Sequence, residues 1–168
     1  MDKATERAIK RVAHKTTIGV KLMVKREYQK MIRAEDACKT GIATYIDEFD
    51  QLRRKQKLFG TCVCITCGRS HEWNSGLIDA GHYLGTRNSV CFIEMNIHCQ
   101  CGHCNRFASG LKNSKYAKWM EANYPEDELS LLQQLNNQSV SFSKEGLVVM
   151  RLAYTARLKA AKEILQAR

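Results

Sequence analysis

The sequence predicts an α+β protein that is mostly helical, with a small cysteine-rich centre between basic helical flanks. Apolar side chains recur at three- and four-residue spacing in residues 1–59 and 116–168. Seven of the eight cysteines fall between positions 62 and 104. One proline and ten glycines are too few for an all-β fold with many turns. We therefore expect a helical region over 1–59, a compact core over 60–115 and a helical region over 116–168.

Two helices are expected in the N-terminal region. The first is one long basic amphipathic helix, suited equally to DNA contact and to dimerisation, because Lys and Arg separate its apolar residues Ile9, Val12, Val20, Met23, Val24, Met31 and Ile32. A second helix is predicted by the same spacing in Ile42, Tyr45, Ile46, Phe49 and Leu52. Gly60 can end this second helix.

The C-terminal region has its own helix signals. Pro125 is followed by three acidic residues, which is typical of a helix start with negative charge in the first turn. The stretch from Leu147 to Leu165 predicts a final amphipathic helix with Arg151, Arg157, Lys159 and Lys162 on it.

The charge distribution indicates a polyanionic partner. The net charge is +10, and residues 1–60 carry 15 basic and 8 acidic side chains, whereas residues 61–110 carry 3 of each. Basic flanks around a neutral centre most often serve nucleic acid binding. No apolar run approaches the ~20 residues that cross a bilayer, and residues 1–30 lack a signal-peptide core. We therefore expect a cytosolic protein that binds nucleic acid and does not bind a membrane.

The cysteines predict a structural zinc site. Cys64-Ile-Thr-Cys67 and Cys101-Gly-His-Cys104 are two C-x-x-C motifs separated by 33 residues. Each motif can offer two thiolates to one tetrahedral Zn²⁺. A redox role is less favoured, because thioredoxin-like motifs occur singly within a βαβ pattern.

The choice of zinc ligands is not unique. Both cysteine clusters read C-x-C-x-x-C, so Cys62 or Cys99 could replace a neighbour. The two-residue spacing favours the set Cys64, Cys67, Cys101 and Cys104. Cys38 and Cys91 are expected in the core rather than at a metal.

The segment between the two motifs has a recognisable pattern. Leu77 to Tyr83 predicts a strand with a bend at Gly81, and Cys104-Asn105-Arg106-Phe107 predicts the beginning of a helix. A zinc ion would pin the hairpin to this helix and bring His82 near Asn105.

These motifs resemble those of a nuclease superfamily. A C-x-x-C motif, Asp79-x-x-His82, a central Asn96 and a C-x-x-C-Asn105 motif resemble the zinc-stabilised HNH endonucleases, also called His-Me finger or ββα-metal nucleases. Asp79-Ala-Gly-His-Tyr83, Asn96-Ile-His98 and Ser109-Gly110 are similar to the lambdoid phage NinG/Rap family. The resemblance covers about residues 60–112 and continues weakly into the C-terminal helices. The first 40 residues depart from it, because they contain no further cysteine motif.

The resemblance implies a zinc-bound ββα-metal core and a structure-specific endonuclease that acts on Holliday junctions and D-loops. It implies His82 as general base, and Asp79 and Asn105 as ligands of a catalytic Mg²⁺ or Mn²⁺. The alternative role for Asp79 is a structural hydrogen bond. Asn96 would tie the hairpin loop together, and His98 is a further candidate site residue. Phosphate contacts are expected from Arg87, Arg106 and Lys112.

The resemblance also implies partners and a setting. They are branched DNA, a second copy of the chain as a homodimer, and phage recombination proteins in the cytoplasm of the bacterial host. An alternative is a non-catalytic zinc-dependent DNA-binding module, and a further one is a zinc-built protein-interaction adaptor. His82 and Asn105 at nuclease spacing favour the enzyme.

Overall fold

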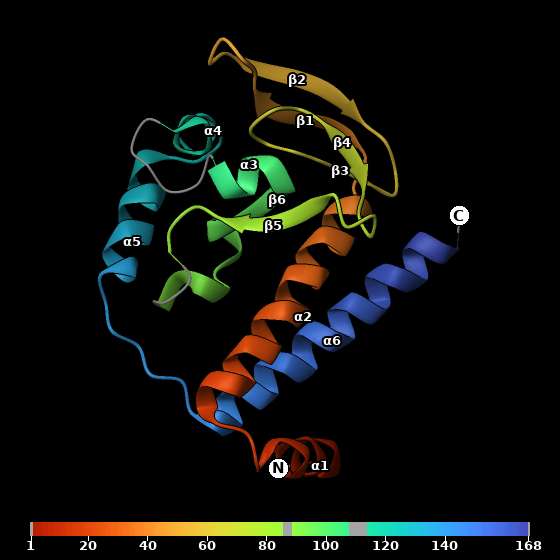
Figure 1. The fold of residues 1–168 in the computed structure, drawn as a ribbon, viewed down its shortest axis with the longest axis vertical. Helices are drawn as coiled ribbons and strands as arrows, with labels where there is room; N and C mark the ends of the chain where they lie inside the picture. The colour runs from red at the N-terminus through yellow and green to blue at the C-terminus, as the bar shows by residue number, and fades with distance from the viewer. Residues whose placement is uncertain (1, 86–88, 108–113, 168) are drawn as a thin grey trace.

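The computed structural model describes residues 2–85, 89–107 and 114–167 (Figure 1). Its α-helices are α1 (Lys3–Val12), α2 (Thr17–Ala37), α3 (Gly102–Phe107), α4 (Lys115–Asn123), α5 (Glu126–Asn136) and α6 (Lys144–Gln166). Its strands are β1 (Gly41–Ile46), β2 (Leu52–Lys57), β3 (Thr61–Val63), β4 (Ser70–Glu72), β5 (Ile78–His82) and β6 (Ile97–Cys101), and two short 3₁₀ turns, η1 (Ser89–Phe92) and η2 (Glu94–Asn96), precede β6. In the part of the chain that is described, no helix is both long and apolar enough to cross a membrane.

Within the described residues, the strands form three separate antiparallel pairs, β1–β2, β3–β4 and β5–β6. The predicted α+β class is therefore confirmed. In the β5–β6 pair, Asp79 lies opposite Gln100, and Gly81 lies opposite His98. Successive side chains of a strand point to opposite faces, so this register decides which residues meet on each face of the hairpin.

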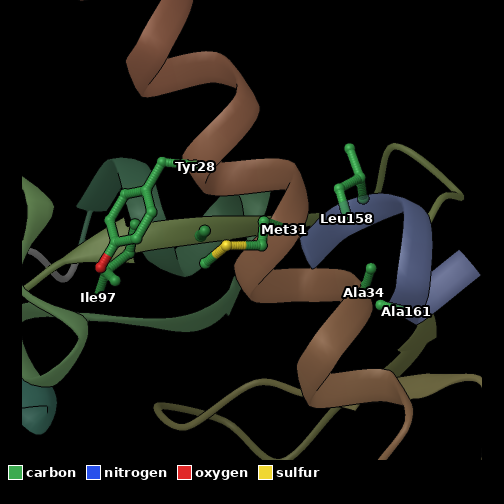
Figure 2. Packing of buried hydrophobic residues seen from close by; sticks show 7 residues of the cluster. Tyr28, Met31, Ala34, Ile97, Leu158 and Ala161 are labelled. Carbon is green, nitrogen blue, oxygen red and sulfur yellow. The ribbon is translucent and has the colours of Figure 1, made fainter. Parts of the chain in front are cut away.

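The two long helices α2 and α6 lie side by side (Figure 1). Near their first turns, Val20 and Val24 of α2 pack with Leu147 and Val148 of α6. Further along, Met31 and Ala34 of α2 pack with Leu158 and Ala161 of α6 (Figure 2). The two helices therefore run in the same direction.

One face of the β5–β6 hairpin packs on this helix pair. Ala80 of β5 and Ile97 of β6 join Tyr28 and Met31 of α2 in one buried cluster (Figure 2). The opposite face carries Asp79, Gly81, His98 and Gln100, and it is covered by α3 and α4. The hairpin thus has an apolar face toward α2 and a polar face toward α3.

The predicted helix over Ile42 to Leu52 is wrong, because this segment forms the β1–β2 hairpin. Gly41 has a φ of +116°, which separates the hairpin from α2. The Asp47 carboxylate accepts hydrogen bonds from the backbone N–H of Phe49 and of Gln51, and Asp50 has a φ of +61°. These features build a tight turn. The helical spacing was misleading, since Ile42 and Phe49 are exposed.

The predicted single N-terminal helix is also wrong, because it is two helices. The Thr16 side chain accepts a hydrogen bond from the N–H of Gly19 and so begins α2 as its N-cap. The predictions of a helix after Pro125 and of a final helix over Leu147 to Leu165 are confirmed by α5 and α6.

Met31→Ala should lower the free energy of unfolding by about 2–5 kcal/mol, because Met31 is fully buried between α2, the hairpin and α6. Leu22→Ala on the same helix is the matched control, since Leu22 is 53% exposed. This substitution should change the free energy of unfolding by no more than about 0.5 kcal/mol. Chemical denaturation measures both. Equal costs for the two variants would contradict this packing.

Candidate metal centre and active site

The four cysteines of the two C-x-x-C motifs converge. The Sγ atoms of Cys64, Cys67, Cys101 and Cys104 all lie within 4.8 Å of one another, and Cys67 Sγ is 3.8 Å from Cys101 Sγ. With Zn–S bonds of about 2.3 Å, the sulfurs of a tetrahedral site lie about 3.8 Å apart. This group could therefore hold a structural zinc ion, as the motif spacing predicts.

Local backbone structure shapes the first motif. The carbonyl of Cys64 accepts hydrogen bonds from the N–H of Cys67 and of Gly68. Gly68 has a φ of +71°, and a Cβ there would lie 2.6 Å from the Tyr45 ring, so a larger residue would be strained. The hydrogen bond from the Cys67 side chain lowers the pKa of Cys64, against burial, which raises it, and a further hydrogen bond from Thr66 adds to the lowering. A cysteine binds zinc in its deprotonated, thiolate form.

A zinc ion here would join three elements. Cys64 directly follows β3, Cys101 ends β6, and Cys104 lies in α3. The β3–β4 pair would thus be fastened to the β5–β6 hairpin, and α3 would be fixed against the polar face of the hairpin. Asn105 follows Cys104 directly, so its position depends on this group.

The side chains of Asp79, Gln100 and Asn105, called here the oxygen group, lie on the polar face of the hairpin. Asn105 Nδ2 donates a hydrogen bond of 3.2 Å to Asp79 Oδ2. A Cβ added to Gly81 would lie 2.7 Å from Asn105 Oδ1 and 2.1 Å from Gln100 Oε1, so both oxygens flank one point above Gly81. Gln100 is fully buried, and its Oε1 accepts no hydrogen bond among the described residues. A buried carbonyl oxygen without a partner is costly, and a cation is one group that would satisfy it.

Gln100 was not predicted as a site residue. It has no motif of its own and lies between the cysteines of the second cluster. The signal that could have found it is the strand register, because Gln100 pairs with Asp79 in the β5–β6 hairpin. Asp79 itself is half-exposed, and Arg33 Nη1 lies 4.0 Å from its Oδ1. The oxygen group is therefore open to solvent on the Asp79 side.

His82 ends β5 and is buried. Its Nε2 lies 3.0 Å from the carbonyl oxygen of Cys91. A carbonyl can only accept, so Nε2 carries the proton and Nδ1 keeps its lone pair. Burial lowers the pKa of His82 to about 4, with a smaller lowering from the charge of Lys25, against the hydrogen bond to Cys91 that raises it. The ring is therefore neutral at pH 7.

The structure places His82 and Asn105 on different sides of the same strand. Asn105 lies over Gly81, the residue before His82, and bonds to Asp79. The His82 ring points to the other face, toward Cys91 and the Lys25 side of α2. The arrangement thus brings Asn105 to the backbone next to His82, but not to the imidazole ring.

His98 lies in a chain of hydrogen bonds between β6 and α4. The Tyr116 hydroxyl donates to the carbonyl of Gly81 over 3.0 Å, so it accepts from His98 Nδ1 at 3.0 Å. His98 Nε2 then accepts from the Tyr124 hydroxyl at 2.8 Å. His98 also packs against the Trp119 ring. These contacts link His98 through the Tyr116 hydroxyl to the backbone carbonyl of Gly81.

The remaining predicted site residues lie around this centre. Asn96 is fully buried, and its side chain bonds to the backbone of Leu84 and Val90 in the loop that connects β5 to β6. Arg106 is exposed on α3 beside Asn105. Arg87 and Lys112 lie outside the described residues.

The other cysteines separate into two kinds. Cys38 packs beside the helix core and Cys91 is buried, and neither joins a metal-ligand group among the described residues. Cys62 and Cys99 do not replace a neighbour in the four-cysteine group, because they lie together with Asp36 in a second group.

Cys101→Ser should remove zinc from the four-cysteine group and lower the melting temperature of the protein, because the thiolate set joins three elements that are small on their own. Cys38→Ser is the control, since Cys38 is partly exposed and belongs to neither cysteine group. Zinc analysis and circular dichroism melting measure the effect. Unchanged zinc content and melting in Cys101→Ser would contradict the metal centre.

The stability of the protein should fall as the pH drops from about 6.5 toward 4, partly through His98. Burial, and to a smaller extent Lys39, lowers the pKa of His98 to about 3 from 6.5. The unfolded chain therefore binds a proton in this range that the folded chain does not, which costs up to about 1.4 kcal/mol per pH unit.

His98→Gln removes this titration, so its free energy of unfolding should depend less steeply on pH than that of the wild type between pH 4.5 and 6.5. His14→Gln is the control, because His14 is exposed. Denaturant titrations at several pH values measure the slopes. A slope unchanged in His98→Gln would show that His98 titrates normally.

Comparison with known proteins places the chain in a family. It matches no curated protein and no solved structure. The family model described as bacteriophage lambda NinG protein matches residues 4–164. This match spans almost the whole chain, including both flanks and the cysteine-rich centre. The chain therefore belongs to the bacteriophage lambda NinG family.

Proposed function

We propose that this protein is a metal-dependent endonuclease that hydrolyses phosphodiester bonds in branched DNA such as Holliday junctions and D-loops. The observation that carries the proposal is the pair of amide oxygens of Gln100 and Asn105 over Gly81, one residue from a buried neutral histidine, with Asp79 hydrogen-bonded to Asn105. A strand pair followed by a helix, beside a four-cysteine group, supports a ββα-metal arrangement.

The oxygen group fits a hard divalent cation. One carboxylate and two amide carbonyls are the ligand types that Mg²⁺ and Mn²⁺ prefer. Gln100 contributes an otherwise unsatisfied buried oxygen, and Asp79 keeps the group open to solvent and to DNA. A bound Mg²⁺ or Mn²⁺ would stabilise the negative charge that develops on the scissile phosphate.

His82 has the protonation state of a general base. Its Nε2–H is held by the Cys91 carbonyl, which leaves the Nδ1 lone pair to take a proton from water. The lowered pKa keeps this lone pair free at neutral pH. The Tyr116 hydroxyl fixes the Gly81 carbonyl, which directly precedes His82, so the His98–Tyr116 chain would position the base.

Basic helices next to the site would hold the DNA. Lys25 and Lys21 lie on the face of α2 toward Cys91, and Lys25 acts electrostatically on His82. Phosphate contacts by such residues strengthen binding at low salt. These lysines, together with the net charge of +10, would suit a branched DNA, in which several phosphate backbones meet. A homodimer would suit the two cuts that a symmetric junction needs.

Family membership supports a role in phage recombination. We accordingly expect the protein to act with phage recombination proteins in the cytoplasm of the bacterial host.

His82→Ala should lower the cleavage rate of a labelled four-way junction by about 10²–10⁴-fold in Mg²⁺ or Mn²⁺, because a general base contributes about this much. Binding of the junction should stay nearly unchanged. His14→Ala is the matched control, since His14 is exposed and far along the chain from the hairpin. Unaltered cleavage by His82→Ala would exclude His82 as the base, and equal cutting of a linear duplex would contradict the preference for branched DNA.

The second candidate function is a zinc-dependent DNA-binding module without catalysis. The observation that favours it is the placement of the His82 ring and the Asn105 side chain on opposite faces of β5. Binding of the junction by the wild type with no cleavage in either metal would select this alternative.

A further inference from the structure

Beyond the proposed nuclease function, we propose that Asp36, Cys62 and Cys99 form a second zinc site, separate from the four-cysteine group. One ligand atom from each of these residues lies within 4.8 Å of the other two. Cys62 is completely buried, and Cys99 is 4% exposed. Two thiols and a carboxylate at this separation are a ligand set that Zn²⁺ accepts.

The two groups arise from the same strand geometry. Cys62 precedes Cys64 by two residues, and Cys99 precedes Cys101 by two residues. In extended backbone, residues two apart lie on one face and about 6.6 Å apart. The N–H of Ile65 donates to the carbonyl of Cys99, which sets the two segments beside each other. The Cys62 thiol therefore lies next to the Cys99 thiol, and the Cys64 thiol lies next to the Cys101 thiol, two residues further along each segment.

The third ligand comes from the end of α2. The N–H of Gly60 donates to the carbonyl of Ala37, which holds the last turn of α2 against the start of β3. Asp36 precedes Ala37 and thereby reaches the Cys62–Cys99 pair. Zn–S bonds of about 2.3 Å and Zn–O bonds of about 2.0–2.2 Å place the ligand atoms of a tetrahedral site about 3.5–3.8 Å apart. The separations in this group, all within 4.8 Å, are compatible with that spacing.

This group is electrically neutral both without and with zinc, and Lys57 is part of the reason. Its ammonium is buried, lies 2.6 Å from Asp36 Oδ2, and also donates to the carbonyl of Asp36. Without metal, Lys57 and Asp36 form a neutral pair beside two thiols. When Zn²⁺ binds, the two thiol protons leave to solvent, so the two new thiolate charges balance the charge of the ion. A buried site that stays neutral avoids the cost of an uncompensated charge.

The site would keep one coordination position open. Three protein ligands leave the fourth tetrahedral position for water or another small ligand. Asp36, Lys57 and Cys99 line the wall of a cavity of about 570 Å³ between the β1–β2 hairpin, α2 and β6. The second zinc is therefore reachable by solvent and should exchange faster than the zinc of the four-cysteine group.

The test is the zinc content of the full-length chain, produced with added zinc under reducing conditions and measured by inductively coupled plasma mass spectrometry. We expect two zinc ions per wild-type chain and one in the Cys62→Ala, Cys99→Ala double variant. Cys38→Ala should keep two, because Cys38 belongs to neither group. A chelator should remove one zinc from the wild type rapidly and one slowly, and the double variant should lack the rapid phase.

One zinc ion in the wild type would overturn the proposal, whether or not Cys62 and Cys99 are joined by a disulfide. Two ions in the double variant would overturn it as well. A native circular dichroism spectrum and the one remaining zinc of the double variant show that it has folded. Asp36→Ala gives a second measure, because it should accelerate the rapid phase and leave the slow phase unchanged.

Discussion

Four cysteine thiols, drawn from two segments that lie 33 residues apart, form the contact on which the central part of this protein depends. The strands they connect are only three to five residues long, and isolated strand pairs of this size are marginal in water. A zinc ion that joins β3, β6 and α3 would add to the buried cluster of Ala37, Ile78 and the cysteines that holds these short strands together. The place of Asn105, directly after Cys104, follows from the same contact.

The β5–β6 hairpin divides structural and chemical roles between its two faces. Ala80 and Ile97 on one face are packed against α2 and α6, which fixes the hairpin in place. The other face keeps polar oxygens close to Gly81, where only a residue without a side chain leaves room for them. His82 at the end of β5 lies on the packed face, and this explains both its burial and its low pKa. A rigid scaffold thus holds groups that would be unstable on a loop.

The sequence predicted those features whose signals are local. The C-x-x-C spacing identified the four-cysteine group, and apolar periodicity identified the final helix. The β1–β2 hairpin was missed because its apolar residues follow helical spacing, although Ile42 and Phe49 are exposed. Gln100, the His98–Tyr116 chain and the Asp36 group depend on contacts between distant segments. Such contacts follow from strand register and helix packing, which no short motif encodes.

The proposed divalent-cation site consists of Asp79, Gln100 and Asn105 on the hairpin next to the four-cysteine group. Crystals of the protein grown with Mn²⁺, and measured at the manganese absorption edge, would show whether a cation binds there. We expect an anomalous difference peak in contact with the side-chain oxygens of these three residues. Manganese bound elsewhere, with none at this group, would contradict a cation site at these three residues.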